Sequence, residues 1–160
     1  MTIKVGEKVP AVKIKQMTPD GMRDVDTGEF FKGKTVVMFA VPGAFTPTCS
    51  AKHLPGFVEK AAQIKAKGVD AIACLSVNDA FVMSAWGKDQ KAEGKVQMLA
   101  DGNGDFTRAV GLELDASGNG LGKRSQRYAM VVEDGVIKTL NVEKPGTFEV
   151  SSADAILKAL

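Results

Sequence analysis

The chain has 160 residues, enough to bury one sizeable hydrophobic core and too few to suggest a second domain. Its formal net charge is +2, from 21 basic and 19 acidic residues, and no basic block or aromatic-interleaved patch would track a phosphate backbone, which argues against nucleic-acid binding. No stretch approaches the roughly 18 apolar residues of a membrane span, and the first residues lack the apolar core of a signal peptide. We therefore expect one soluble domain over residues 3–160, in the cytoplasm, or in an organelle if a transit peptide has been removed.

The first part of the chain alternates between apolar and polar residues over two short stretches. Residues 9–15 and 22–25 carry these patterns, and the turn-forming sequence Thr-Pro-Asp-Gly lies between them at 18–21. We expect a β-hairpin at the start of the fold.

The next segment places a cysteine where an anion would be stabilised. Residues 36–41 form an apolar run typical of a strand buried on both faces, and residues 42–49 (Pro-Gly-Ala-Phe-Thr-Pro-Thr-Cys) end it abruptly. Thr46 or Thr48 can cap a following helix, so Cys49 falls at or near its first turn, where unpaired N–H groups and the helix dipole favour negative charge. Because the thiolate is the nucleophilic form of cysteine, this is the setting of a reactive thiol.

A helical pattern follows this cysteine. Apolar residues at near-helical spacing run over residues 54–65, and Gly68 marks the end of the helix after a lysine-rich turn. Pro55 cannot donate a hydrogen bond to the carbonyl of Ala51, so we expect the turn that bears Cys49 to be kinked away from the longer helix or separate from it. Such a joint is a candidate for local unwinding.

Strands and helices alternate in the middle of the chain. Residues 69–77 and 96–100 are expected to form buried strands, and a helix capped by Asn78-Asp79 and ending near Trp86 lies between them. Gly102 and Gly104 are expected to belong to a turn, since no lysine or helix context completes a phosphate-binding loop.

The C-terminal part predicts a hairpin and a last helix. Strands at 127–132 and 136–140 flank an Asp-Gly turn, and Ser151 with Asp154 has the spacing of a helix-opening capping box. Parallel strands joined by helices, with a late hairpin, indicate an α/β (α+β) fold with a central mixed sheet flanked by helices.

The motifs closely resemble the peroxiredoxins. Pro42, Thr46 and Cys49 match the family signature of a proline, a threonine four positions later and the peroxidatic cysteine three positions beyond it. Further segments resemble the type II (atypical, plant type II-like) subfamily, at residues 52–57, 76–83, 99–102, 111–114 and 125–128. Because these segments occur in order over nearly the whole chain, the resemblance implies a thioredoxin-like fold.

The resemblance also implies a chemistry, that of a thiol-dependent peroxidase. It implies that Cys49 attacks the O–O bond of hydrogen peroxide or a small alkyl hydroperoxide and becomes a sulfenic acid. The Thr46 hydroxyl, Arg127 and the backbone N–H of Cys49 are implied to hold the peroxide oxygens, with Pro42 shielding the thiolate. A helix dipole contributes only about 0.3–1 kcal/mol, so a fixed cation such as Arg127 is expected to share the stabilisation of the thiolate. No metal, haem or flavin cofactor is implied.

The cysteine content bears on which thiol, the resolving thiol, reduces the sulfenic acid of Cys49. Cys74 lies in the apolar run 71–75 and is expected to be a small core residue, because free cysteines are among the most buried residue types, while a role in resolution stays open. Some relatives carry a resolving cysteine near the position of residues 144–148, but no cysteine follows Cys74 here. We therefore expect an external thiol, glutathione with glutaredoxin or thioredoxin, to reduce Cys49.

Other functions remain open at this point. A peroxide sensor or redox relay would pass the oxidation of Cys49 to a partner, and a thiol–disulfide reductase would act on protein disulfides. Thr46 occupies the first position of a C-x-x-C spacing, which disfavours the reductase. His53, four positions after Cys49, could pair with it in a hydrolase or acyltransferase, but Pro55 disturbs the helix and no third residue orients the histidine. We therefore expect His53 to have a local structural or pH-tuning role near the site.

Two aromatic residues are candidates for a dimer interface. The type II resemblance implies a homodimer packed through the loops beside the active site, in which exposed aromatic side chains would be anchors. Phe45 and Trp86 are the candidates, expected near this interface.

Overall fold

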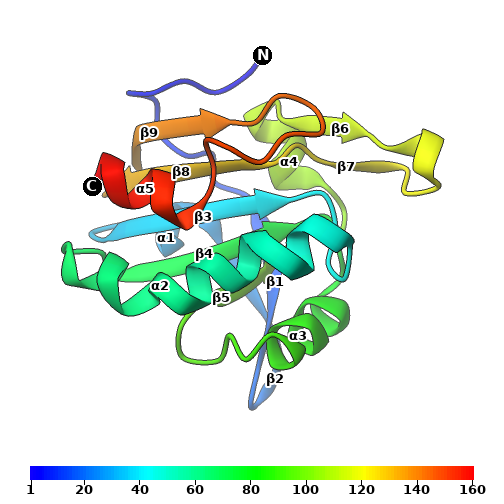
Figure 1. The fold of residues 1–160 in the computed structure, drawn as a ribbon, viewed down its shortest axis with the longest axis horizontal. Coiled ribbons are helices and arrows are strands. Elements are labelled where there is room, and N and C mark those ends of the chain that lie inside the picture. Colours follow the sequence, from blue (N-terminus) through cyan, green and yellow to red (C-terminus); the bar gives the residue numbers. More distant parts are fainter.

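A mixed sheet forms the centre of the computed structural model, which describes residues 1–160 (Figure 1). Its strands are β1 (Lys13–Thr18), β2 (Gly21–Asp26), β3 (Thr35–Val41), β4 (Ala71–Ser76), β5 (Gln97–Ala100), β8 (Tyr128–Glu133) and β9 (Val136–Val142). They lie in the order β2-β1-β5-β4-β3-β8-β9, with β3, β4 and β5 parallel and the other pairs antiparallel. The pair β6 (Glu113–Asp115) and β7 (Lys123–Ser125) makes a separate arm.

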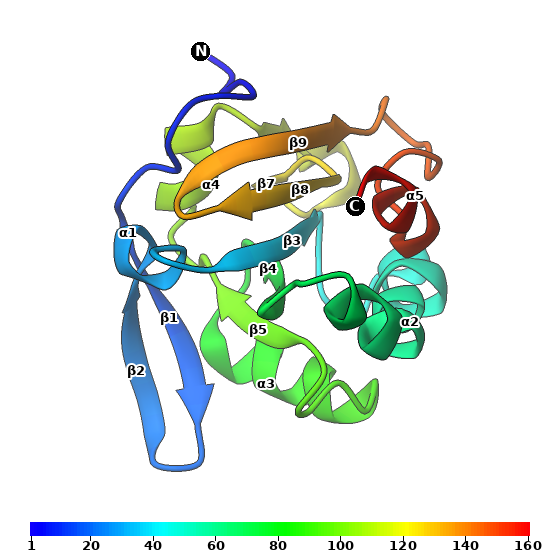
Figure 2. The same cartoon turned by 90° about the vertical axis from the view of Figure 1, so that its left-hand side faces the viewer.

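Helices cover both faces of the central sheet (Figure 2). One face carries α2 (Leu54–Ala66), α3 (Ala80–Asp89) and α5 (Ala153–Ala159), and the other carries α1 (Thr27–Phe30), α4 (Asp105–Val110) and the N-terminal segment. Two hydrophobic cores result, because alternate residues of each strand point to opposite faces. This arrangement confirms the expected α/β fold. None of the helices is long and apolar enough to cross a bilayer.

Central strand β3 shows the alternation directly. Val37, Phe39 and Val41 belong to the core beneath α2, whereas Val36, Met38 and Ala40 belong to the core on the opposite face. All of β3 after its first residue is buried, as the apolar run predicted. The loop that follows is therefore attached to a strand that is buried and paired on both sides.

The predicted elements are present, with ends that differ by a few residues. The hairpins β1–β2 and β8–β9 form as expected, and the second one turns at Asp134-Gly135, both with positive φ, as a tight hairpin turn requires. The short elements α1, α4, β6 and β7 were not predicted.

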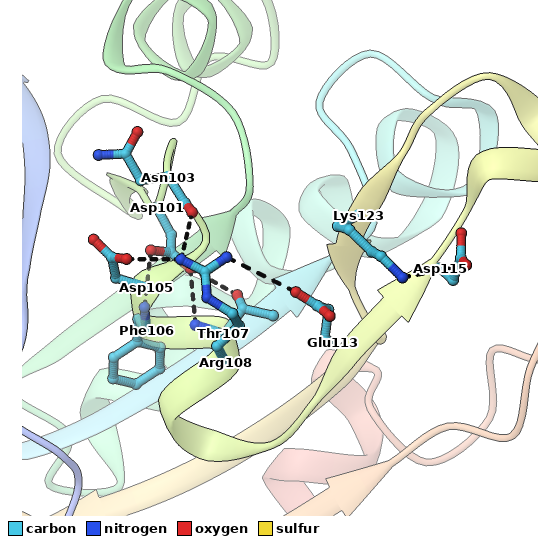
Figure 3. Close-up of polar contacts among 9 residues, drawn as sticks. All are labelled: Asp101, Asn103, Asp105, Phe106, Thr107, Arg108, Glu113, Asp115 and Lys123. Atoms are coloured by element: carbon cyan, nitrogen blue, oxygen red, sulfur yellow. Dashed lines mark hydrogen bonds and ion pairs between the residues drawn. The ribbon is translucent and has the colours of Figure 1, made fainter.

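Helix α4 begins because a buried carboxylate precedes it. Asp101, only 2% exposed, accepts hydrogen bonds from the backbone N–H of Phe106 (3.0 Å) and Thr107 (2.9 Å) and from the Thr107 hydroxyl (2.7 Å), as Figure 3 shows. The intervening Gly104 adopts a left-handed conformation, so the glycine-rich segment is a turn, as expected. Burial raises the pKa of Asp101.

The helical turn that bears Cys49 differs from the expected break. It is a π-helical turn, η1 (Cys49–His53), which continues directly into α2, and the N–H of Leu54 donates to the carbonyl of Cys49 five residues back. Pro55 then lies in the first turn of α2, and because it has no N–H it donates no hydrogen bond to the η1 turn before it. The prediction of a separate or kinked piece is thus replaced by a wide turn continuous with the helix.

The cap of the last helix was predicted one residue too early. Ser152, not Ser151, is the N-cap of α5, and its hydroxyl accepts from the N–H of Ala155 (3.1 Å). Ser151 is fully buried, and its hydroxyl donates to Glu143 at 2.6 Å. The Ser151 hydroxyl, which the pattern assigned to the cap, therefore binds the buried Glu143 carboxylate instead.

Candidate active site

Cys49 lies at the start of η1, just beyond the end of β3, with a fully buried side chain. Thr48 is the N-cap residue but makes no side-chain capping bond, and the Thr46 hydroxyl donates to the carbonyl of Gly43 (2.7 Å). The prediction that one of these hydroxyls caps the helix is therefore wrong. The N–H groups of this helix start lack side-chain partners and leave an electropositive end beside the sulfur.

Arg127 contacts Cys49 because β8 and β3 are neighbouring strands of the sheet. It directly precedes β8, whose first residue, Tyr128, pairs with Ala40 near the end of β3. This register brings together residues 78 positions apart, and Arg127 Nη2 lies 3.1 Å from Cys49 Sγ as a hydrogen-bond donor. The guanidinium keeps its charge at all relevant pH values, so it places a fixed positive charge beside the sulfur.

His53 lies beside Arg127, near the site as expected. Its Nδ1 lies 2.8 Å from Arg127 Nη1, and its Nε2 lies 2.9 Å from the carbonyl oxygen of Ser151. Since the guanidinium can only donate, Nδ1 accepts and Nε2 carries the proton that it donates to Ser151. Burial first, and the Arg127 charge second, lower the pKa of His53 to about 3, so it is a neutral imidazole.

The Cys–His pairing expected of a hydrolase is therefore absent. Both ring nitrogens of His53 have partners, Arg127 and Ser151, and neither partner is Cys49. The imidazole acts on the sulfur only through the guanidinium.

This buried neutral histidine predicts an acid-sensitive fold. The unfolded chain binds a proton at His53 below pH 6.5, whereas the folded chain does so only near pH 3, so stability is lost as the pH falls through that window. The loss from this group reaches about 2 kcal/mol by pH 5 and about 5 kcal/mol when protonation is complete. Denaturant unfolding of the wild type and His53→Gln between pH 5 and 7 tests this. We expect a shallower pH dependence for the variant, and equal slopes would contradict the prediction.

A pocket of about 800 Å³ opens beside the guanidinium. Pro42, Thr48 and Arg127 line it together with the loop of residues 143–149. The ring of Phe148 lies 5.9 Å from Arg127 Cζ, which covers the cation on this side. Of the four predicted site residues, Pro42, Cys49 and Arg127 thus lie close together.

Thr46, the fourth, lies in the loop before Cys49 and is partly buried. Its hydroxyl proton is engaged with the Gly43 carbonyl, and the lone pairs of its oxygen remain as acceptors. No contact joins Thr46 directly to Cys49 Sγ.

The loop is held by residues that the sequence suggested for another purpose. Asn78, expected to cap α3, instead accepts from the N–H of Ala44 (3.0 Å) and from the Ser76 hydroxyl (2.6 Å), while Asp79 alone caps the helix. Phe45 has φ +63°, a strained value for an aromatic residue, so the surrounding contacts fix its conformation.

The two aromatic candidates for an interface differ in exposure. Trp86 is fully buried, and its indole N–H donates to the Ser50 hydroxyl (3.0 Å), so it is not the exposed anchor that was expected. Its hydrogen-bonded indole fills the core beneath the loop. Phe45 is 53% exposed above it, with ring centroids 6.5 Å apart, and Phe81 is 65% exposed.

Cys74 is a core residue, as expected. It lies fully buried on β4, in the same hydrophobic core as Cys49. Burial raises the pKa of its thiol well above the ordinary value, so Cys74 is far less nucleophilic than an exposed cysteine.

The chain resembles known proteins over almost its whole length. A family model described as Redoxin matches residues 4–157. Peroxiredoxin-2E-2, chloroplastic, of Oryza sativa subsp. japonica is 54% identical, over 99% of this chain and 73% of that protein. Peroxiredoxin-2B of Arabidopsis thaliana is 51% identical, over 99% of this chain and 98% of that protein. The crystal structure of reduced Prx3 in complex with H2O2 from Vibrio vulnificus has 57% identity and a TM-score of 0.96, with 99% of each chain covered.

Proposed function

Because this chain is a type II peroxiredoxin, a thiol-dependent peroxidase of the Redoxin family with a thioredoxin-like fold, we propose that Cys49 is its peroxidatic residue. The observation that carries this assignment is the 3.1 Å contact from the Arg127 guanidinium to Cys49 Sγ at the start of a helix. We propose Thr46 and Pro42 as the other site residues, one as an acceptor for the peroxide and the other as a wall against water.

The proposed step is a displacement at oxygen. The Cys49 thiolate attacks the terminal oxygen of the peroxide, an S–O bond forms and the O–O bond breaks. The attacked oxygen keeps its hydrogen in the sulfenic acid, and the other oxygen leaves with the bonding electron pair and is protonated to water or an alcohol. Cys49 is oxidised by two electrons and the peroxide is reduced by two. Arg127 and the helix N-terminus meet the negative charge as it moves from sulfur to oxygen.

Stopped-flow kinetics test the proposal. Reduced protein is mixed with H2O2 and followed through the fluorescence of Trp86, while a sulfenic-acid trap with mass spectrometry identifies the oxidised residue. We expect oxidation at Cys49 at least about 10²-fold faster than that of a free thiol at equal thiolate concentration. A rate no better than that of the free thiol would overturn the proposal and favour the redox relay or the thiol–disulfide reductase.

For the reductant, we propose an external thiol, glutathione with glutaredoxin or thioredoxin. The burial of Cys74 supports this, because the thiol would have to leave the core to reach another cysteine. A Cys74→Ala variant is expected to turn over peroxide at the wild-type rate with such a reductant, in a coupled NADPH assay. Selective loss of turnover with intact sulfenic-acid formation would instead make Cys74 the resolving thiol.

We also propose a homodimer through the loops beside the active site, with Phe45 and Phe81 as its exposed aromatic residues. Burying an aromatic anchor contributes about 2 kcal/mol or more, so Phe45→Ser should weaken dimerisation at least about 30-fold. Sedimentation velocity measures this, and Met22→Ser, which removes a 48% exposed side chain from the edge strand β2, is the control. A wild type that stays monomeric at high micromolar concentration would contradict the dimer.

We propose a reducing compartment, the cytoplasm or an organelle. The free thiols of Cys49 and Cys74 support it, and the chloroplastic name of the rice relative supports the organellar alternative. Imaging of the tagged protein in its native cell distinguishes the two.

A further inference from the structure

A buried carboxylate stands behind the active site. Glu143 follows β9, in the loop that leads to α5 (Figure 2), and is only 6% exposed. Its Oε2 accepts from the backbone N–H of Glu149 (2.8 Å), Val150 (2.9 Å) and Ser151 (2.8 Å) and from the Ser151 hydroxyl (2.6 Å), and its Oε1 accepts from the Thr147 hydroxyl (3.1 Å). Burial alone would raise the pKa of Glu143, but these hydrogen bonds outweigh it and lower the pKa. The group is therefore a carboxylate at neutral pH.

The residue that Glu143 holds most firmly, Ser151, is the one that orients His53. Three of its groups are engaged: the N–H and the hydroxyl with Glu143, and the carbonyl oxygen with His53 Nε2 at 2.9 Å. A neutral imidazole has a single N–H, so the position of this carbonyl decides which nitrogen carries it. With Nε2 protonated, Nδ1 is free to accept from Arg127.

The other neighbours of His53 cannot fix it in this way. The rings of Phe39, Phe57 and Phe148 lie with centroids 4.8, 5.7 and 4.9 Å from the imidazole, and they offer no strong hydrogen-bonding group. The charged groups that face it are the Arg127 guanidinium and the Glu143 carboxylate, which act on its pKa in opposite directions. The polar anchor of the ring on the side away from Arg127 is thus the Ser151 carbonyl.

We propose that Glu143 is a positioning residue for peroxide reduction, acting through Ser151 and His53 to hold the Arg127 guanidinium against Cys49. The chain of contacts is continuous: Glu143 to Ser151, Ser151 to His53, His53 to Arg127 at 2.8 Å, and Arg127 to Cys49 at 3.1 Å. The inference rests on the peroxidatic role of Cys49 proposed above. By the same bonds, Glu143 also fixes the loop that places Phe148 over the guanidinium.

Glu143→Gln tests the proposal, because glutamine keeps the shape and removes the charge. The rate constant for H2O2 and its pH profile are measured by stopped flow on protein shown to be folded. We expect the rate constant to be about tenfold lower, the usual effect of losing a group that orients a catalytic residue. We also expect the midpoint of the pH–rate profile to shift to higher pH. If this variant does not fold, Ser151→Ala, which removes only the hydroxyl contact, should show the same two changes with smaller size.

Asp101→Asn is the matched control. Asp101 is also a buried carboxylate that collects two backbone N–H groups and a hydroxyl, but it holds α4 rather than the loop behind the site. It should lower stability and leave the rate constant unchanged. An equal loss of rate in this variant would mean that Glu143 acts only on general stability, and the proposal would fail.

A double-mutant cycle separates the inference from the proposed function. In an Arg127→Gln background, Glu143→Gln should have no further effect on the rate, since the group through which it acts is gone. A full and independent effect there, or a wild-type rate for Glu143→Gln alone, overturns the inference. Wild-type reactivity of Cys49→Ser would overturn the proposed function itself.

Discussion

Cys49→Ser should abolish the reaction with peroxide, with a loss of at least about 10⁴-fold in the rate constant, as expected for removal of a nucleophile. The hydroxyl is close in size to the thiol, so the helix and the Arg127 contact can persist while the chemistry is lost. A serine hydroxyl needs a base to become nucleophilic, and the only imidazole nearby has its accepting nitrogen engaged with Arg127. Stopped-flow mixing with H2O2 measures the loss.

The control for this variant is Cys74→Ala. It removes the other thiol from the same hydrophobic core and places no polar group there. We expect it to react with H2O2 at the wild-type rate. Should the two variants lose the same fraction of the rate, the reactive sulfur would not be confined to Cys49.

Arg127→Gln should slow the reaction by about 10²–10³-fold, the usual effect of removing one preorganised donor from a site of developing negative charge. Glutamine keeps some hydrogen-bonding capacity but carries no charge, so the thiolate loses its fixed counter-charge and His53 Nδ1 loses the donor 2.8 Å away. The pH–rate profile should move to higher pH as well. Rate constants over a range of pH values measure both effects.

Arg108→Gln controls for the loss of an arginine as such. Arg108 is a surface residue of α4, paired with Asp105 at 2.8 Å and Glu113 at 3.9 Å (Figure 3). It should keep the wild-type rate and profile. If Arg127→Gln behaved like Arg108→Gln, the guanidinium contact with Cys49 would have no role in the reaction.

The place of Cys49 was readable from the sequence because its determinants are local. A buried strand, an abrupt Pro-Gly stop and a following helix act within a few positions of each other. The partnership with Arg127 was not readable in this way. It depends on the register of β3 against β8, which pairs Ala40 with Tyr128, and only the family resemblance pointed to that arginine.

The predictions that were wrong also depend on contacts that form only in the folded chain. Ser151 fits a capping pattern, but a carboxylate eight positions earlier binds its hydroxyl, so the cap moves to Ser152. Trp86 was expected to be an exposed aromatic residue because sequence does not reveal which side of a helix faces the sheet; in the fold it is buried under the loop. Glu143 has no sequence signal, since three of its partners are backbone N–H groups, which every residue but proline carries.

The π-helical turn at Cys49–His53 also sets the direction in which the Cys49 side chain points around the helix axis. Each residue of an α-helix advances about 100° around the axis, so a turn with one extra residue gives everything before it a different azimuth. If these residues formed an ordinary α-helical turn, the Cys49 side chain would point roughly a quarter of a circle away from its present heading. The guanidinium is attached to a strand and could not follow. The extra residue in the turn thus aims the sulfur.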